Sequence, residues 1–404
     1  LLRQFFGDQF RAPRQPRERR EGGLGSGVIV RADGYILTNN HVVEGAEQVS
    51  VELTDGRTLK AKVVGNDAAT DLAVLKVDGK NLQTLALGDS DAVRVGDVVL
   101  AVGNPLGVGQ TVTMGIVSAK GRATPDAGDG YEDFIQTDAP INHGNSGGAL
   151  VSTRGELIGI NSQILSPTPT GGNIGIGFAI PANMARNVMT QLIDHGSVRR
   201  GMIGVTIQPV TADIARSLGL SEIHGALVNS VNAGGPADKA GIRQGDVITA
   251  INEQPVKDSN SLRNVVAQMM PGTSTKVSLL RDGKPQTVTV TLAELKAQAA
   301  RDDDGAGGAE RDSSGFGMSV EPLTPELASQ LGVKARSGLV IDDVAPGGRA
   351  AEAGLRNGDV IAQVDGKAVT TGEALRSALS TGDRPALLLV HRGATTFFLT
   401  LERR

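Results

Sequence analysis

Residues 141–150 read INHGNSGGAL, which places one serine among three glycines, with an asparagine directly before it. Glycine in such a run indicates a backbone that bends sharply or passes close to another group. Ser146 on this bend is a candidate nucleophile with backbone N–H groups arranged around it. Gly, Asn and Ser also dominate ordinary turns, so this stretch alone favours a turn and the choice depends on the rest of the chain.

The composition of the chain bounds its class. At 404 residues it is long enough for two or three domains, each with its own core. Hydrophobic residues make up 39% and charged residues 21%, which suits globular domains and excludes a wholly disordered chain. A formal net charge of -4 gives no support for a nucleic-acid partner, and no apolar run reaches the roughly 18 residues of a membrane span.

Several kinds of chemistry are excluded or unsupported. Cysteine is absent, so thiol nucleophiles, thiolate metal sites and disulfides are excluded. No GxxxxGK[ST] loop supports nucleotide use, and we expect neither a metal nor a cofactor. The chain starts at Leu1 without a methionine or a signal peptide, so we expect a processed form. Many glycines and few aromatic residues favour β-rich domains with tight turns.

The N-terminal half is predicted to be all β. Within residues 24–181, Asp-Gly, Gly-Asn and Asn-Pro turns separate the short apolar runs GVIV, YILTN, VSVEL, LAVLKV and DVVLAV. This pattern is typical of a β-sandwich or β-barrel. Residues 182–195 (ANMARNVMTQLIDH) have helical spacing and predict a helix that leads into the next region.

The C-terminal half contains a duplication. KAGIRQGDVI at 239–248 and EAGLRNGDVI at 352–361 are identical at seven of ten positions. Each copy is followed by a helical pattern and then a strand-like run, so a domain of roughly a hundred residues is repeated. Between the copies, residues 295–315 are charged and glycine-rich, which predicts a flexible linker.

A serine nucleophile needs a base, and imidazole is the usual base near neutral pH. Four of the five histidines have contexts that favour other roles: His143, which is too close to Ser146 in the sequence, and His195, His224 and His391. His41, at the end of a predicted strand in YILTNNHVV, is therefore the candidate base.

A third group must orient the imidazole, and Asp71 in TDLAVLKV stands just before a strongly apolar strand. A turn-capping aspartate is the alternative explanation. The order His41, Asp71, Ser146 is that of chymotrypsin-like double barrels. In that fold the first barrel carries His41 and Asp71, and the second carries Ser146.

The chain resembles the HtrA/Deg family of serine proteases from about Phe5 onward. The motifs that carry the resemblance are TNNHVV, TDLAVLKV, GNPLGVGQTVT, FIQTDAPIN, GNSGGAL and GGNIGIGFAIP, followed by the two GDVI-containing repeats. The resemblance implies a mainly β chain, with a chymotrypsin-like double β-barrel followed by two α+β PDZ domains. Two PDZ domains resemble the soluble, DegQ-like periplasmic members. The implied domains are an N-terminal segment (1–23), a protease domain (24–195), PDZ domain 1 (196–294), a linker (295–315) and PDZ domain 2 (316–404).

The resemblance implies that His41, Asp71 and Ser146 form a catalytic triad and that the N–H groups of Gly144 and Ser146 form the oxyanion hole. Position 143 departs from the family, whose members usually carry proline there. One interpretation is that His143 makes the order of the oxyanion turn pH-dependent. The other is an exposed substitution without consequence.

Substrate preference is implied by the same resemblance, as a shallow pocket for small aliphatic residues such as Val or Ala. Its lining comes from Ile141 and from the loop at 173–178, namely Asn173, Ile174, Gly175 and Ile176. The absence of a carboxylate in these stretches argues against a preference for basic residues. The isoleucines are equally well explained as core residues.

The repeats resemble PDZ domains, which bind an extended peptide as an added strand and hold its carboxylate with backbone N–H groups. The matching loops are Met202, Ile203, Gly204 and Val205 in the first copy, and Gly315, Phe316, Gly317 and Met318 in the second. An ordinary turn is the alternative, and the second copy has assembly contacts as a further alternative.

Two further segments correspond to regulatory and assembly elements of the family. The polar loop at 118–132 matches a sensor loop, with Arg122 at its arginine position, and a solvated arginine is the alternative. Phe5, Phe6 and Phe10 match aromatic residues that pack around a threefold axis. We therefore expect a trimer or a multiple of trimers.

The sequence thus predicts an ATP-independent serine endopeptidase of the bacterial periplasm that degrades misfolded or unfolded proteins. The expected partners are unfolded polypeptides, their C-terminal peptides and further copies of the chain, with no nucleic acid and no transmembrane span. The alternative function is a peptide-binding chaperone or scaffold in which proteolysis is secondary.

Overall fold

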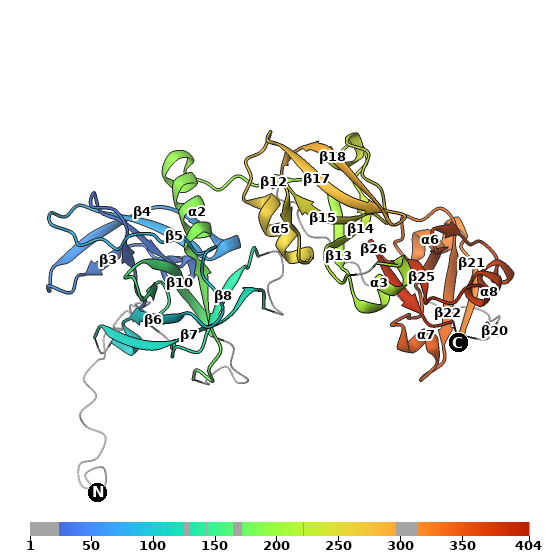
Figure 1. Cartoon of the computed structure of the whole chain (residues 1–404), viewed down its shortest axis with the longest axis horizontal. Coiled ribbons are helices and arrows are strands. Elements are labelled where there is room, and N and C mark those ends of the chain that lie inside the picture. The colour runs from blue at the N-terminus through green and yellow to red at the C-terminus, as the bar shows by residue number, and fades with distance from the viewer. Residues whose placement is uncertain are drawn as a thin grey trace, which may run out of the picture. The chain divides into compact units, whose positions relative to one another are not determined.

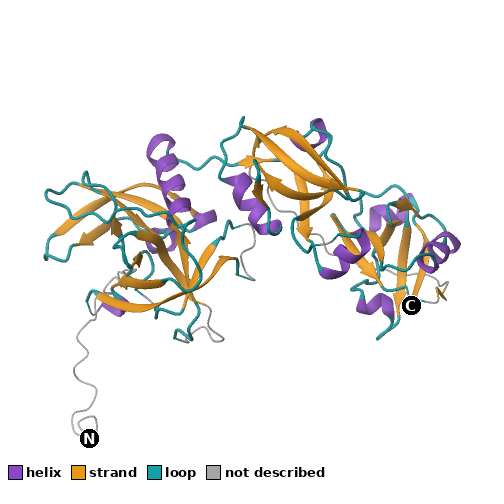
Figure 2. Cartoon of the chain, in the orientation of Figure 1, coloured by secondary structure: helices purple, strands orange, loops and turns teal. Residues whose placement is uncertain are grey.

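The computed structural model describes residues 24–107, 109–124, 130–142, 144–164, 172–220, 222–295, 313–314 and 316–403. The chain divides into two compact units. Unit 1 comprises the chain up to Lys120 together with Phe134–Gly196, and unit 2 comprises Gly121–Asp133 and Ser197–Arg404. Strands dominate both units (Figures 1 and 2), which confirms the mainly β prediction.

Unit 1 begins with a five-stranded antiparallel sheet in the order β1-β2-β5-β4-β3. Its strands are β1 (Val28–Ile29), β2 (Tyr35–Thr38), β3 (Val49–Glu52), β4 (Thr58–Asp67) and β5 (Leu72–Val77). The run LAVLKV forms the central strand β5 and is almost entirely buried, whereas the peripheral strand β3 alternates between half-buried and exposed residues. Successive side chains of a strand point to opposite faces of the sheet, so a strand with one face in solvent, such as β3, alternates in burial. The central strand β5 is covered on both faces and is buried almost throughout.

The second sheet of unit 1 closes into a barrel in the order β10-β11-β8-β7-β6-β9. Its strands are β6 (Val98–Gly103), β7 (Thr111–Arg122), β8 (Phe134–Thr137), β9 (Ala149–Ser152), β10 (Leu157–Ile164) and β11 (Gly177–Pro181). Closure leaves no unpaired edge within the ring. Apolar side chains from these strands fill the interior, including Val99, Val117, Ile135, Leu150 and Ile158.

The described part of unit 1 also contains two α-helices and two 3-10 turns. They are α1 (Asn40–Val43), α2 (Ala182–His195) and the turns Ala68–Thr70 and Pro105–Gly107. The helix predicted for residues 182–195 has the predicted bounds. Its apolar face packs on β4, β5, β10 and β11, and it ends at Gly196, whose φ of 72° suits a glycine C-cap. No helix among the described residues is long and apolar enough to cross a membrane.

Unit 2 contains the two repeats, here called the first repeat (197–295) and the second repeat (313–314 and 316–403). The main sheet of the first has the order β13-β14-β15-β17-β18, with β16 paired to β15 and a separate β12-β19 pair. Its elements are β12 (Gly201–Met202), β13 (Val205–Pro209), α3 (Ala212–Leu218), β14 (Ala226–Val231), α4 (Pro236–Lys239), β15 (Val247–Ile251), β16 (Gln254–Pro255), α5 (Ser259–Ala267), β17 (Ser274–Arg281), β18 (Lys284–Thr291) and β19 (Ala293–Glu294).

The second repeat has the same plan, in the order β20-β21-β22-β23-β25-β26 with β24 paired to β23. Its elements are β20 (Ser313–Ser314), β21 (Met318–Pro322), α6 (Pro325–Gln330), β22 (Leu339–Val344), α7 (Arg349–Glu352), β23 (Val360–Val364), β24 (Lys367–Ala368), α8 (Gly372–Ser380), β25 (Ala386–Arg392) and β26 (Thr395–Leu401). The helices α5 and α8 and the strands β17 and β25 confirm the pattern predicted after each GDVI motif.

A buried ion pair marks the correspondence between the repeats. Asp246 is bonded by two nitrogens of Arg281, at 2.8 and 2.6 Å, and Asp359 is bonded in the same way by Arg392, at 2.7 Å to each oxygen. Both carboxylates are 0–1% exposed, so each needs this bidentate partner. The aspartate of each GDVI motif thus anchors the loop before β15 or β23.

Two positions that carry amides in the first repeat carry acids in the second. Asn229 of β14 corresponds to Asp342 of β22, and Gln208 of β13 corresponds to Glu321 of β21. Burial, together with the nearby Glu321, raises the pKa of Asp342 to about 6. The second repeat therefore holds a carboxyl pair where the first holds two amides.

We expect Asp342→Asn, which reproduces the first repeat, to stabilise the second repeat above pH 6. The folded pKa of Asp342 is higher than the unfolded one, so ionisation costs the folded state stability as the pH rises from about 4 to about 6. After allowance for partial solvent exposure the gain at pH 7.5 is about 1 kcal/mol. Thermal unfolding at pH 4.5 and 7.5 measures it. The exposed neighbour Asp343→Asn is the control, and equal gains at both pH values would contradict the prediction.

Candidate active site

His41 and Asp71 meet at the surface of the first sheet. His41 lies in α1, one turn beyond the end of β2, and not at the strand end that the sequence predicted. Its Nδ1 lies 2.9 Å from both carboxylate oxygens of Asp71, and its backbone N–H donates to Asp71 Oδ1 at 3.1 Å. Two atoms of the histidine are thus held by one carboxylate, which fixes the ring orientation.

The backbone of Asp71 is also tied to the segment before His41. Asp71 is in the left-handed region, at φ 54° and ψ 42°, which Asp tolerates better than most residues. Its carbonyl accepts hydrogen bonds from Asn39 Nδ2 at 3.0 Å and from the Asn40 N–H at 3.1 Å. The segment 39–41 therefore binds Asp71 through both its carbonyl and its carboxylate.

The hydrogen bond to Asp71 raises the pKa of His41, and burial opposes the rise. A general base must be neutral, so we expect kcat/KM for a peptide substrate to rise with pH through an apparent pKa above the ordinary histidine value of 6.5. A pH series from 5 to 9 measures this limb. Glu44 also raises the pKa of His41, but less than Asp71 does. We therefore expect Glu44→Gln to lower the apparent pKa of the profile only slightly. An apparent pKa at or below 6.5 would refute the assignment of His41 as the general base.

Ser146 is linked to Asp71 through Ser162. The Ser146 hydroxyl donates to the Ser162 carbonyl at 2.9 Å, and the Ser162 hydroxyl donates to Asp71 Oδ2 at 2.8 Å. The described hydrogen bonds do not include one between His41 and Ser146. Catalytic hydrogen bonds in enzymes without substrate are often long and form in the substrate complex. Thus the structure brings His41, Asp71 and Ser146 into one region, with the serine hydroxyl turned toward β10.

Ser162 is the one residue of this region that the sequence reading missed. It lies on β10, in the run LIGINSQI, where Asn161 is 0% and Ser162 is 4% exposed. Two buried polar residues in an otherwise apolar strand need partners. That signal was present in the sequence, but the partner of Ser162 is 91 residues away at Asp71.

The two glycines after Ser146 allow close backbone approaches, Gly147 to the segment before the first sheet and Gly148 to β6 of its own barrel. A Cβ on Gly147 would lie 2.1 Å from the Ser26 carbonyl oxygen, and one on Gly148 would lie 2.2 Å from the Val102 carbonyl oxygen. Gly147 also has a φ of +84°. The Ser26 N–H donates to the Ser146 carbonyl at 2.8 Å. No other residue type fits at 147 and 148, and this answers why INHGNSGGAL needs its last two glycines.

Gly144 supplies the sharp bend before the serine, with a φ of +98°. Its carbonyl accepts a hydrogen bond from the Ser26 hydroxyl at 2.7 Å. Among the described residues, none accepts a hydrogen bond from the N–H of Gly144 or of Ser146, although Gly144 is buried. Two backbone donors next to the serine thus have no acceptor within the part of the chain that the structure describes.

The two stretches predicted to line a substrate pocket are joined to each other. Asn173 donates from Nδ2 to the Ile141 carbonyl at 3.0 Å and from its N–H to Asn142 Oδ1 at 3.1 Å. The Ile141 side chain is 1% exposed within the core of the closed barrel. Ile174 is 57% exposed, Ile176 is half-buried, and Gly175 has a φ of +88°.

The two predicted peptide-binding loops have the same backbone pattern. The carbonyls of Ile203 and Gly204 accept from the N–H groups of Ala237 and Asn232, at 2.9 and 3.0 Å. In the second repeat those of Phe316 and Gly317 accept from Ala350 and Ala345. Met202 and Val205 are half-buried, at the end of β12 and the start of β13, and Met318 is buried at the start of β21.

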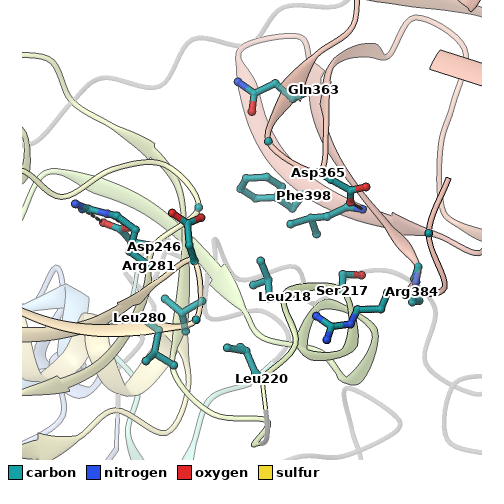
Figure 3. A pocket seen from close by; sticks show the side chains of 18 of the residues that line it. Ser217, Leu218, Leu220, Asp246, Leu280, Arg281, Gln363, Asp365, Arg384 and Phe398 are labelled. Carbon is teal, nitrogen blue, oxygen red and sulfur yellow. Dashed lines mark hydrogen bonds and ion pairs between the residues drawn. The ribbon is translucent and has the colours of Figure 1, made fainter. Parts of the chain in front are cut away.

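Some predicted residues lie outside the described part of the chain: Phe5, Phe6, Phe10, His143 and Gly315. Arg122 is described and exposed, at the end of β7. Within the described ranges, no group of three or more His, Asp or Glu is arranged to hold a metal ion. A cavity of about 630 Å³ lies in unit 2 and includes none of the three triad candidates (Figure 3).

Comparison with known proteins gives a consistent result along the chain. The model of the trypsin-like peptidase domain matches residues 25–160, and PDZ domain models match residues 201–292 and 340–392. The "probable periplasmic serine endoprotease DegP-like" of Pseudomonas savastanoi pv. phaseolicola is 45% identical over 389 residues, which cover 96% of this chain and 80% of that protein.

Two further similarities have the same character. The "periplasmic pH-dependent serine endoprotease DegQ" of Escherichia coli is 43% identical over 408 residues, which cover 99% of this chain and 84% of that protein. The solved structure "HtrA-type protease AlgW with tripeptide" is 51% identical, with a TM-score of 0.59, and the alignment covers 68% of this chain and 90% of that chain.

Proposed function

Because the chain belongs to the HtrA/Deg family and is a serine endopeptidase, we propose that His41, Asp71 and Ser146 carry out the hydrolysis. The single observation that carries this assignment is the connected set of hydrogen bonds around Asp71. One carboxylate accepts from His41 on one side and from Ser162 on the other, and Ser162 accepts from Ser146. A nucleophile, a base and an orienting acid thus share one small region of unit 1.

In the proposed reaction, the Ser146 hydroxyl turns from the Ser162 carbonyl toward His41 when a peptide binds. Ser146 Oγ attacks the scissile carbonyl carbon while His41 takes the hydroxyl proton. The C–N bond breaks as His41 returns that proton to the leaving amine, and an acyl-enzyme ester remains on Ser146. Water, deprotonated by His41, then cleaves the ester and restores the serine. Asp71 stabilises the imidazolium that forms in each half-reaction.

The N–H groups of Gly144 and Ser146 form the proposed oxyanion hole. Both lack a hydrogen-bond acceptor among the described residues. Preformed donors of this kind contribute roughly 3 kcal/mol each to transition-state stabilisation. The pocket beside them takes small aliphatic side chains along Asn173–Ile176. Ile141 joins it through its carbonyl, which accepts from Asn173, because its side chain is 1% exposed in the barrel core.

The proposed substrates are misfolded or unfolded polypeptides in the bacterial periplasm. The names of the relatives, all periplasmic endoproteases, support the compartment. In the proposed organisation, the protease domain spans 24–195, the PDZ domains span 196–294 and 316–404, and the loops at 202–205 and 316–318 receive peptide C-termini. The paired carbonyl contacts of these loops support the last point, because they leave the N–H groups on the other side of the backbone.

The loop at 121–133 is the proposed regulatory element. It leaves β7, returns at β8 and belongs to unit 2. The ring centre of Tyr131 lies 4.6 Å from the guanidinium carbon of Arg200 and 5.0 Å from that of Arg263, both in the first repeat. The Glu132 carbonyl accepts hydrogen bonds from the side-chain amides of Asn260 and Asn264 in α5. These contacts support a link from the first PDZ domain to the loop that carries Arg122.

A trimer or a multiple of trimers is the proposed assembly. Apolar side chains of β6 and β7 support it, since Val98, Val112, Met114 and Ile116 are 43%, 57%, 70% and 40% exposed on neighbouring strands. An exposed apolar stripe of this kind is typical of a surface that another copy covers. Light scattering of the purified chain gives the mass directly.

A fluorophosphonate probe tests the enzyme against the alternative, a peptide-binding scaffold. We expect labelling of the wild type at Ser146, located by peptide mapping, and almost none in His41→Ala, which keeps the serine but removes the base. Glu47→Ala, at an exposed position six residues further on, is the matched control and is expected to label like the wild type. Absence of label on Ser146 in the wild type would favour the scaffold.

A further inference from the structure

The two PDZ domains are joined by an apolar seam within unit 2. The second domain contributes side chains of β25 and β26 on the sheet face that is turned away from its own core, and the first contributes side chains of α3, of the loop before it, and of β14 and β15. The cluster comprises Val210, Ile214, Ala215, Leu227 and Val247 of the first repeat, and Leu387, Leu389 and Phe398 of the second. Each of these side chains is at most 7% exposed. We call this cluster the seam.

The internal repeat shows that the seam is a specialised feature of the second domain. Arg281 corresponds to Arg392, so Lys276 and Ser278 of β17 correspond to Leu387 and Leu389 of β25. Across the hairpin, Ser278 faces Thr287 and Leu389 faces Phe398. The second domain therefore carries three large apolar side chains where the first carries Lys, Ser and Thr. Its own core does not contain these three residues, so their burial depends on the first domain.

Gln208 connects the seam to the strand that would accept a peptide. Its side-chain amide donates to the Phe398 carbonyl at 3.1 Å, and its Oε1 accepts from the Phe398 N–H at 2.8 Å. Phe398 lies on β26, the outermost strand of the second sheet. Gln208 lies on β13, the outermost strand of the first sheet, beside α5. One side chain thus satisfies both backbone groups of Phe398 while it anchors β13.

A peptide adds to a PDZ domain along such an outermost strand. An edge strand has one neighbouring strand and is prone to local opening, which a bound peptide must suppress at a cost in affinity. Here β13 is held on one side by β14 and at Gln208 by the second domain. The anchor lies only three residues from Val205, at the start of β13.

We propose that the second PDZ domain is a brace that orders β13 of the first, with Gln208 and Phe398 as positioning residues. The inference rests on the proposed peptide binding by the first PDZ domain. In this arrangement the second domain raises the affinity of the first for peptide C-termini without touching the peptide.

The full chain tests the brace with two variants and a matched control. Gln208→Ala removes both hydrogen bonds to Phe398, and Phe398→Thr installs the residue found at the corresponding position 287 of the first repeat. Arg216→Ala is the control: its ion pair with Glu402, at 3.0 Å, also joins the two domains, but both side chains are 58% exposed, so its loss is expected to change little.

Two readouts are combined. Fluorescence anisotropy of a fluorescein-labelled decapeptide that ends in three valines gives the affinity. The same peptide with an amidated C-terminus, which lacks the carboxylate, is the negative control. Hydrogen exchange gives the opening of β13. We expect both single variants to weaken binding and to accelerate β13 exchange by roughly tenfold, the scale of two lost hydrogen bonds. Exchange in β17, and the rate of cleavage of a short ester substrate, should not change.

A third measurement asks whether the seam is closed in solution. Leu218 of the first domain and Phe398 of the second line the cavity at the end of the seam (Figure 3). The chain has no cysteine, so Leu218→Cys accepts a single environment-sensitive label such as acrylodan. We expect blue-shifted emission that moves to the red in the Phe398→Thr background.

The outcomes separate the brace from the function on which it rests. If the wild type fails to bind the peptide, the proposal that the first domain binds peptide C-termini is wrong. Hydrogen exchange of β13 in the two variants then tests by itself whether the second domain orders this strand. Unchanged β13 exchange in both variants overturns the brace. So does a loss of thermal stability in both variants with unchanged peptide affinity, because the seam would then be purely structural. Water-like emission from the label in the otherwise wild-type chain also overturns it.

Discussion

Replacement of Ser146 by alanine is expected to lower kcat for casein degradation by about 10⁵- to 10⁶-fold, the scale found when a triad serine is removed from a serine protease. Without Oγ there is no atom to form the acyl-enzyme, and only binding and backbone donors remain to assist direct attack by water. The loss should lie in kcat, since alanine leaves the proposed substrate pocket beside residues 173–176 in place. Casein cleavage followed by gel and by released peptides measures it.

The fold should survive this substitution. Ser146 Oγ makes one described hydrogen bond, to the Ser162 carbonyl at 2.9 Å, and the neighbouring glycine contacts do not involve its side chain. We expect the oligomer mass and the unfolding temperature to stay close to those of the wild type. Ser50→Ala, at an exposed position of β3, is the control and should retain full activity. Substantial casein cleavage by the Ser146 variant would place the nucleophile elsewhere.

The second large effect is expected for Asp71→Asn, which should lower kcat by about 10⁴-fold. The change is nearly isosteric, and Asn tolerates the left-handed backbone of position 71. An amide NH2 group directed at His41 Nδ1 stabilises the tautomer whose proton sits on Nε2, so that nitrogen no longer accepts the serine proton. The imidazolium also loses the carboxylate that raises the pKa of His41.

Two companion variants sharpen the Asp71 experiment. Asp78→Asn, whose side chain is fully exposed, controls for the loss of one negative charge and should be neutral. Ser162→Ala removes one hydrogen bond to Asp71 Oδ2 and should lower kcat about tenfold. Equal losses for Ser162→Ala and Asp71→Asn would mean that Asp71 acts mainly by holding β10, against the proposed role.

The parts of this molecule that could be predicted from its sequence are those with local signals. The helix at Ala182–His195 can be predicted with its bounds, because the spacing of its apolar residues identifies its buried face and Gly196 identifies its C-terminal end. The duplicated GDVI motif identified the repeats because Asp246 and Asp359 are both buried and each needs an arginine at the corresponding position, Arg281 or Arg392. The motif around Ser146 was readable because close contacts with Ser26 and Val102 exclude side chains at 147 and 148.

The parts that could not be predicted depend on distant pairings. The partner of Ser162 could not be predicted, because Asp71 is 91 residues away and precedes a strand of the other sheet of unit 1. Likewise, Leu387 and Leu389 look like core positions in an apolar run, and only the register of β25 shows that they face away from the core of their own domain. His41 was placed at a strand end because a four-residue helix such as α1 is too short to show periodicity.

The packing of Gly147 against Ser26 and Thr38 has a consequence for biosynthesis. The imidazole and its carboxylate come from one lobe, while the attacking hydroxyl and its Ser162 acceptor come from the other, and that glycine is wedged where the lobes touch. A half-folded chain therefore holds fragments of the catalytic apparatus that cannot act together. Under the proposed triad, peptidase activity requires that both lobes have folded and packed together.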